Sequence, residues 1–136
     1  MNFYLASAFA RHPEMRAARD DLVAAGHTVT SRWIDLHGGD QLEAMVANDL
    51  REHPERAARY AMADIQDLFA ADTVISFTGF GGRGGRHVEF GLAIAASKRL
   101  IVVGPREHVF HALPEVEYHS TWSECLAALT GKEMRS

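Results

Sequence analysis

A glutamate that follows a run of glycines is the feature of this chain best suited to chemistry. The segment "GFGGRGGRHVEF" places five glycines between Gly79 and Gly85, and Glu89 follows shortly after them. A helix predicted from Arg86 to Ser97 puts Glu89 in its first turn, where the helix dipole and free N–H groups stabilise negative charge. We therefore expect a partly buried carboxylate that is ionised at neutral pH, which is a candidate nucleophile.

The glycines and arginines before this acid are candidate ligand-binding residues. Glycine lacks a Cβ atom and lets a sugar or phosphate approach the backbone closely, while arginine pairs with anions. The residues expected to bind substrate in this loop are Gly82, Arg83, Gly84, Gly85 and Arg86. The alternative is a connection whose glycines only supply turns, but this alternative leaves the glutamate unexplained.

A second acid comes from a helix expected over about 41–71, with a break near His53-Pro54, where proline disfavours a continuing helix. One face of this helix carries Tyr60, Asp64, Asp67 and Leu68 at three- and four-residue spacing. Asp64 is either a partner of the glutamate or a surface charge. We expect Asp67 to be a solvated charge, and Asp72 to be a turn or cap residue.

The stretch "GFGGRG" also satisfies the dinucleotide-binding pattern G-x-G-x-x-G. That pattern belongs after the first strand of a βαβ unit, whereas here it follows the third predicted strand. A Walker lysine motif is absent from the sequence. The pattern therefore does not indicate a dinucleotide site.

Apolar runs and helical periodicity alternate along the whole sequence. We expect strands over 2–7, 27–33, 72–78, 99–104 and 116–119, and helices over 12–25, 41–71, 86–97 and 120–129. This order predicts one α/β domain over residues 1–136, a Rossmann-like or flavodoxin-like three-layer sandwich with a parallel sheet of about five strands. Ligands bind such sheets at the carboxyl ends of the strands. The end of the first strand and the glycine loop are expected to meet there.

Composition narrows the function classes. The chain has 136 residues, 47% of them hydrophobic, and a net charge of −4, which does not favour a binder of nucleic-acid polymers or anionic membranes. The sequence contains no apolar run of membrane-spanning length and no basic signal-peptide start. Its single cysteine, Cys125, is expected to be a packing residue, and one cysteine cannot form a disulfide within the chain. We therefore expect a cytoplasmic protein. His108 and His111 have no obvious third ligand, so we expect surface histidines, no metal and no cofactor.

Three segments in order resemble the nucleoside 2-deoxyribosyltransferase superfamily, which includes deoxynucleoside 5'-monophosphate N-glycosidases. They are "FYLASAF", "ADIQDLFAADTVISF" and "GGRHVEFGLAIAASKRLIVV". The resemblance implies that Glu89 attacks the anomeric carbon of a 2-deoxyribosyl group and forms a covalent ester. It also implies that Asp64 protonates or positions the departing base, that Tyr4 orients the nucleophile, and that Phe9 lies against the base.

The sequence also departs from this superfamily. The monophosphate hydrolases carry a glycine-serine-arginine phosphate cradle after the first strand. In this chain Ser7 and Arg11 are the candidate substrate-binding residues in its place, although their register differs. Transferases carry an aspartate six residues before the glutamate, where this chain has Arg83. Hydrolysis and transfer therefore both stay open, as do a free nucleoside and its monophosphate. Trp33, expected to end the second strand, is a further candidate for the base pocket.

Two other interpretations are weaker or differ in class. The phosphoribohydrolase loop G-G-x-G-T-x-x-E is imitated by "GGRGGRHVE", but the spacing is one residue longer and the threonine is absent. A non-catalytic module that binds nucleotides in the same crevice is the alternative to an enzyme. The resemblance further implies a homodimer or higher homo-oligomer, because related enzymes complete their sites with residues of a neighbour.

Overall fold

The sheet is built from the apolar runs of the sequence. The computed structural model describes residues 1–35, 51–79 and 84–131. Within them, five strands pair in parallel in the order β2-β1-β3-β4-β5. The strands are β1 (Asn2–Ala6), β2 (Thr28–Val29), β3 (Thr73–Phe77), β4 (Arg99–Val103) and β5 (Val116–His119). The predicted five-stranded parallel sheet is confirmed, and its order is that of flavodoxin-like folds.

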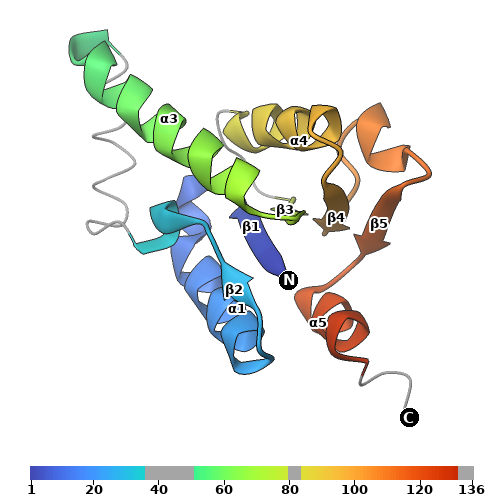
Figure 1. The fold of residues 1–136 in the computed structure, drawn as a ribbon. Coiled ribbons are helices and arrows are strands. Elements are labelled where there is room, and N and C mark those ends of the chain that lie inside the picture. Colours follow the sequence, from blue (N-terminus) through green and yellow to red (C-terminus); the bar gives the residue numbers. More distant parts are fainter. Residues whose placement is uncertain (36–50, 80–83, 132–136) are drawn as a thin grey trace.

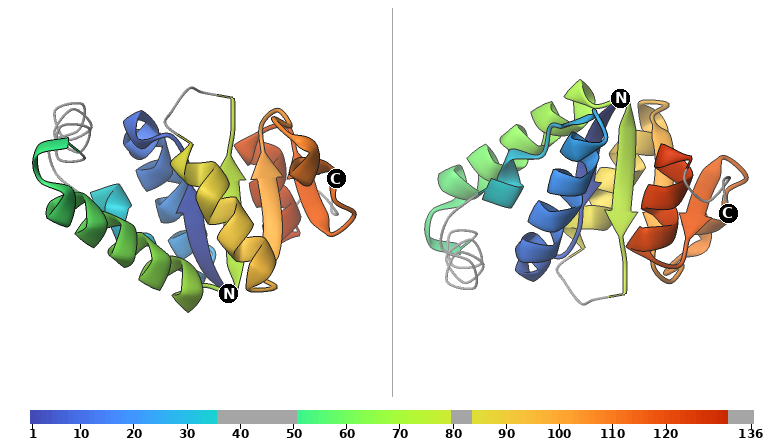
Figure 2. Two further views of the ribbon diagram at one scale, coloured as in Figure 1. Left: turned by 90° about the horizontal axis from the view of Figure 1, so that it is seen from above. Right: turned by 90° about the horizontal axis from the view of Figure 1, so that it is seen from below.

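Helices cover both faces of this sheet (Figures 1 and 2). Helices α3 and α4 contact each other on one face, and α1 and α5 contact each other on the other face. The α-helices are α1 (His12–Ala24), α3 (Pro54–Ala70), α4 (Gly85–Ala95) and α5 (Trp122–Thr130), and the short 3₁₀ helices are η1 (Phe9–Arg11), η2 (Arg32–Asp35) and η3 (Val109–Ala112). The predicted three-layer sandwich is therefore confirmed.

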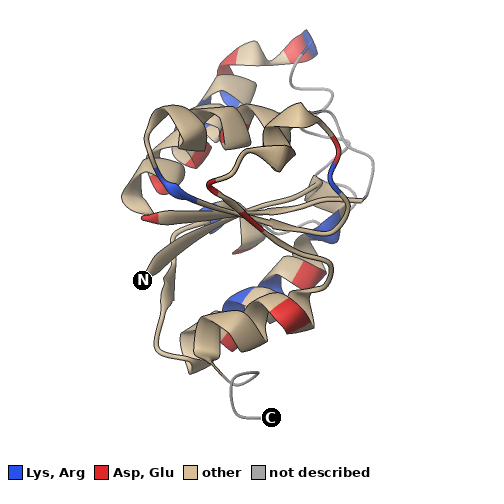
Figure 3. Cartoon of the chain, turned by 90° about the vertical axis from the view of Figure 1, so that its right-hand side faces the viewer, with Lys and Arg blue, Asp and Glu red and all other residues tan. Residues whose placement is uncertain are grey.

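The core lies on both faces of the central strands. Every residue of β3 is buried, as are Phe3–Ala6 of β1 and Leu100–Val103 of β4, because these strands have neighbours on both sides and helices on both faces. Figure 3 shows the sheet nearly edge-on between the two helix layers, which carry charges of both signs. Cys125 is buried, and burial raises the pKa of its thiol to about 12, in agreement with a packing role.

The second strand is shorter than predicted, because the chain leaves the sheet after Val29. Two side chains then satisfy the main chain of Leu5 in place of a longer strand. Ser31 Oγ accepts a hydrogen bond from Leu5 N at 2.7 Å, and Trp33 Nε1 donates one to Leu5 O at 2.9 Å. The prediction of a strand through Trp33 is therefore wrong, and Trp33 lies in η2 instead.

Helices α3 and α5 begin at residues that carry a local start signal. Helix α3 begins at Pro54, as expected from the proline, and the side chain of Thr121 caps α5 by accepting a bond from Glu124 N at 3.2 Å. Residues 36–50, where a loop and the first part of a helix were predicted, lie outside the described residues. In the part of the chain that the structure describes, no helix has both the length and the apolar character needed to cross a bilayer.

Helix α4 begins earlier than predicted. Gly84 is its N-cap with a φ of +88°, a left-handed conformation that suits glycine, and the helix starts at Gly85. Glu89 therefore lies in the second turn of α4, and the prediction of a first-turn acid is wrong.

Candidate active site

A cavity of about 170 Å³ brings together the end of β1, η2, α3 and α4. Its position follows from the strand order, because β1 and β3 are neighbours while their connections run to opposite sides of the sheet, which opens a crevice. The cavity is lined by Ser7, Phe9, Arg32, Trp33, Tyr60, Ala63, Asp64, Asp67 and Glu89. Five of these, namely Ser7, Phe9, Trp33, Asp64 and Glu89, are residues that the sequence proposed for a site.

Tyr4 contacts this group of residues from β1. It is fully buried in β1, and its hydroxyl donates a hydrogen bond to Glu89 Oε2. Burial, followed by the charge of Glu89, raises the pKa of Tyr4 well above its usual value. The phenol therefore stays protonated and holds one oxygen of the carboxylate in a fixed direction.

Glu89 and Asp64, two of the three acids that line the cavity, hold protons more tightly than usual. Burial raises the pKa of Glu89 to about 8, with the hydrogen bond from Tyr4 lowering it and the charge of Asp64 raising it. Burial and the charge of Asp67 raise the pKa of Asp64 to about 6, against the effect of Arg32. The expectation that Glu89 is ionised at neutral pH in the unliganded protein is therefore wrong. The second-turn position removes it from the free N–H groups, and desolvation dominates.

Asp67 anchors the segment that leaves the sheet. It is 6% exposed, and its carboxylate accepts hydrogen bonds from Arg32 Nε at 2.8 Å and Arg32 N at 3.0 Å. Thr30 Oγ1 donates to the main-chain oxygen of Asp67 at 2.7 Å. The prediction that Asp67 is a solvated charge is therefore wrong. This acid ties α3 to the start of η2 and so positions the residues that follow.

Phe9 and Trp33 form an aromatic wall in the lining of this cavity. The rings of Phe9 and Trp33 have centroids 5.7 Å apart and planes tilted by 40°. Trp33 is held from the sheet side by its bond to Leu5 O. Beside this wall, Ser7 Oγ is buried and has no hydrogen-bond partner among the described residues. The wall offers a flat apolar surface, and the serine offers a hydroxyl for a polar ligand.

The two predicted substrate arginines that the structure describes lie away from this cavity. Arg86 is 7% exposed and pairs with Glu107, with Nη2 at 2.9 Å from Oε1. Arg11 pairs with Glu14 at 2.8 Å and lines a separate hollow of about 630 Å³ between α1 and α5. Gly84 and Gly85 form the start of α4 and are not among the residues that line the cavity, while Gly82 and Arg83 lie outside the described residues.

Sequence reasoning gave no role in the site to four residues that line the cavity. Tyr60 and Asp67 share the face of α3 that carries Asp64, so their three- and four-residue spacing was a usable signal. Ala63 gave no such signal. Arg32 was not assigned to the site because its segment was expected to continue as a strand. In a strand, successive side chains point to opposite faces, so Arg32 and Trp33 would not face the same cavity.

The comparisons with known proteins are made at the level of structure. No protein-family model matches the chain, and no curated protein matches its sequence. The structure resembles the CMP N-glycosidase BcmB from Clostridium botulinum, with 21% identity, 95% of this chain and 98% of that chain covered, and a TM-score of 0.58. It also resembles a 2-deoxyribosyltransferase from the psychrotolerant bacterium Bacillus psychrosaccharolyticus, with 19% identity, 93% and 90% covered, and a TM-score of 0.68.

Both matches extend over nearly the whole of each chain. This chain therefore has the three-layer α/β fold of these two enzymes.

Proposed function

We propose that this chain is a member of the nucleoside 2-deoxyribosyltransferase superfamily and processes the N-glycosidic bond of a 2'-deoxyribonucleoside or its 5'-monophosphate. The observation that carries the proposal is the pair of acids, Glu89 and Asp64, lining one cavity with a buried tyrosine bonded to Glu89. The likeness of the fold to an N-glycosidase and a deoxyribosyltransferase supports the same reaction class.

In the proposed reaction, Glu89 attacks the anomeric carbon from the face opposite the base. The bond from this carbon to the base nitrogen breaks as an ester to Glu89 forms, and Asp64 gives its proton to the departing base. Water, or the nitrogen of a second base, then attacks the same carbon and releases the carboxylate, while Asp64 takes back a proton. Tyr4 keeps one carboxylate oxygen fixed, so that the other oxygen faces the sugar.

The number of protons that Glu89 and Asp64 hold together equals the number that the proposed reaction requires. With a pKa of about 8 for Glu89 and about 6 for Asp64, the pair carries about one proton and one negative charge near pH 7. The reaction requires the same total, with the proton on Asp64 and the charge on Glu89. Substrate binding therefore has to move one proton between neighbouring acids, without exchange with bulk solvent.

The remaining lining residues divide between the base and the sugar. Phe9 and Trp33 provide the surface on which a base stacks, which accepts purines and pyrimidines alike. Ser7 supplies a hydroxyl to the sugar or its 5'-substituent. Arg32 provides positive charge at the cavity, although its guanidinium is already bonded to Asp67. We propose a small-molecule nucleoside or nucleotide as the ligand and a cytoplasmic homo-oligomer as the working form.

One assay tests the proposal. The protein is incubated with a panel of nucleosides and 5'-monophosphates, in ribose and deoxyribose forms, with and without an acceptor base, and products are separated by chromatography. We expect free base with water alone for a hydrolase, and a new nucleoside only with acceptor for a transferase. The deoxyribose forms are expected to react faster, because a sugar without a 2'-hydroxyl reaches the oxocarbenium-like transition state more easily.

Two variants assign the chemistry to the acid. Glu89→Gln keeps the shape of the side chain and is expected to lower turnover at least about 10³-fold while substrate still raises the unfolding temperature. The exposed Glu115→Gln is the matched control and is expected to keep full activity. Full turnover in Glu89→Gln would disprove the proposal. Stabilisation by nucleotides without base release in the unmodified protein would establish the binding module instead.

A further inference from the structure

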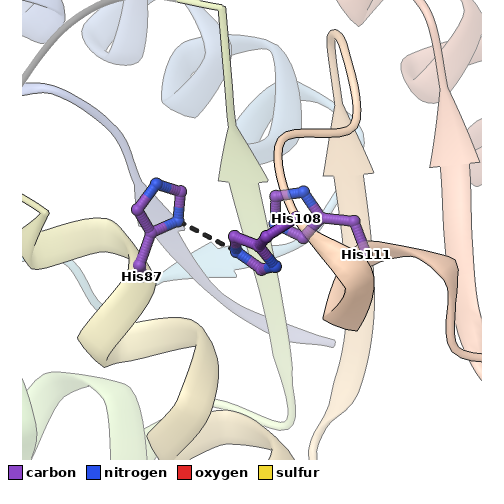
Figure 4. Close-up of side chains that lie close together, drawn as sticks. All are labelled: His87, His108 and His111. Atoms are coloured by element: carbon purple, nitrogen blue, oxygen red, sulfur yellow. Dashed lines mark hydrogen bonds between the residues drawn. The ribbon is translucent and has the colours of Figure 1, made fainter.

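Three histidines from two segments of the chain meet beside the first turn of α4 (Figure 4). His87 belongs to α4, whereas His108 and His111 lie in the connection between β4 and β5. One ring nitrogen from each residue lies within 4.8 Å of those of the other two. The sequence alone did not indicate a third ligand for His108 and His111, because His87 is 21 residues from His108 along the chain.

The ring positions already approach those of ligands on one metal ion. His108 Nε2 and His87 Nδ1 are 3.1 Å apart. Two zinc–nitrogen bonds of about 2.0–2.1 Å at a tetrahedral angle separate the nitrogens by about 3.4 Å. The rings of His108 and His111 have centroids 3.7 Å apart and those of His87 and His111 are 6.0 Å apart, so the third imidazole lies against His108.

Burial excludes a purely surface role for His111, whereas His87 and His108 are half-buried. His111 is 1% exposed, which overturns the expectation of a surface histidine. His111 Nε2 and His108 Nδ1 are buried and have no hydrogen-bond partner among the described residues. Buried polar atoms are normally satisfied, and an ion bound through His111 Nε2 would satisfy one of these two nitrogens. The neutral imidazole is the form of histidine that binds a metal.

We propose that His87, His108 and His111 bind a zinc ion. Nitrogen donors without oxygen ligands suit zinc and its transition-metal neighbours rather than magnesium or calcium. The ion would take the place of the proton shared by His87 Nδ1 and His108 Nε2. A water molecule completes a tetrahedral set.

Glu107 fits a supporting role next to the ion. Its Oε1 lies 3.7 Å from His87 Nε2, which is the nitrogen left to donate a proton when Nδ1 binds the metal. Histidine ligands commonly donate in this way to a carboxylate, which orients the ring. Glu107 is itself held by Arg86 at 2.9 Å, so the carboxylate is fixed in place.

Binding of the ion to His111 replaces a hydrogen bond that this ring makes with the main chain. Glu107 N donates a hydrogen bond to His111 Nδ1 at 3.0 Å, so the proton of the neutral ring sits on Nε2. Binding through Nε2 moves this proton to Nδ1, and binding through Nδ1 uses the accepting lone pair directly. In either case the ion replaces one main-chain hydrogen bond, a small contribution beside the binding free energy of a structural zinc ion.

The site is structural rather than part of the cavity. None of the three histidines lines the cavity that contains Glu89. His87 and Glu89 are two residues apart on α4, so their side chains point to nearly opposite sides of the helix. The ion would fasten the first turn of α4 to the segment before β5. The helix that carries Glu89 is thereby held at its N-terminal end.

The test is zinc binding to the full chain without a histidine tag, after treatment with a chelator. Isothermal titration with zinc chloride is expected to show one ion per chain, and zinc is expected to raise the unfolding temperature. His87→Asn is the main variant, because this half-buried residue is not needed for the core; it is expected to weaken binding about 100-fold or more. His53→Asn, at an exposed histidine of the described chain, is the matched control.

Cobalt(II) gives an independent measurement of the same site. A tetrahedral nitrogen-rich site is expected to give a visible absorption band that zinc abolishes, that His108→Asn removes and that His53→Asn retains. No saturable zinc binding by the unmodified protein would overturn the proposal. Equal zinc affinity in the His87→Asn variant and the unmodified protein would do the same, even if His108→Asn fails to fold.

Discussion

The hydroxyl of Tyr4 donates a hydrogen bond to Glu89 Oε2, which joins the buried centre of the sheet to the second turn of α4. The tyrosine is fully buried, so its ring cannot leave this position without disturbing β1. The carboxylate, by contrast, lies on the lining of a cavity. The buried tyrosine thus fixes the direction of one carboxylate oxygen of a residue 85 positions away in the sequence.

Tyr4→Phe tests this relationship, because it removes the hydroxyl and keeps the ring. A hydrogen bond to a charged group contributes about 1.5–3 kcal/mol, so we expect kcat for base release to fall by about 10- to 150-fold. Steady-state kinetics with the best substrate of the panel is the measurement. Tyr118→Phe, at an exposed tyrosine of β5, is the control and is expected to retain kcat. An unchanged kcat in Tyr4→Phe would show that the hydrogen bond has no catalytic role.

The raised pKa of Asp64 predicts how stability depends on pH. An acid whose pKa is about 6 in the folded chain and 3.8 when unperturbed binds more protons folded than unfolded between these values. The free energy of unfolding contributed by this group therefore falls as pH rises from about 4 to about 6. Asp64→Asn has no such loss. We expect its stability relative to the unmodified chain to be about 1–2 kcal/mol higher at pH 7 than at pH 4.

Urea unfolding of both proteins at the two pH values measures this difference, and contributions from acids that do not interact with Asp64 cancel in it. Asp20→Asn, at an exposed acid of α1, is the control and is expected to show no comparable change. A relative stability of Asp64→Asn that is the same at both pH values would show that Asp64 is not desolvated in the folded protein.

The sequence predicted the strands and layers well because their signals are local. The apolar runs of β1, β3 and β4 are buried on both faces and match their predicted ranges closely. The exception, β2, shows the limit of this reasoning. The segment after Val29 has strand-like composition, yet Ser31 and Trp33 bond to Leu5 through their side chains. Local propensity cannot distinguish a strand from a segment whose side chains replace one.

The candidate site was predictable where helix spacing or family resemblance pointed to it. Asp64 and Glu89 were named from the sequence, and both line the cavity. The protonation of Glu89 was not predictable, because it depends on burial and on the charge of Asp64, which lies on another helix. The partner of Arg86 was hidden for the same reason, since Glu107 is distant in sequence. Contacts between elements account for these two errors.

Phe9→Leu tests whether the aromatic wall binds the base. Stacking of a base on an aromatic ring contributes about 1–3 kcal/mol, so KM is expected to rise about 5- to 150-fold, with a smaller change in kcat. The same loss is expected for purine and pyrimidine substrates, because both stack through a flat face. Phe69→Leu, at an exposed phenylalanine of α3, is the control. A KM that stays constant in Phe9→Leu would place the base elsewhere.

Asp67 is expected to act through Arg32 and Asp64 rather than on the substrate. Asp67→Asn weakens the bonds that hold the start of η2, so Trp33 loses its fixed position and KM is expected to rise several-fold. The same change removes a negative charge that raises the pKa of Asp64, so the alkaline limb of the kcat profile is expected to move to lower pH.

Arg32→Lys keeps a positive charge but loses the paired geometry of the guanidinium. It is expected to raise KM without moving that limb to lower pH. A rise in KM with no shift of the limb in Asp67→Asn would restrict this residue to a structural role.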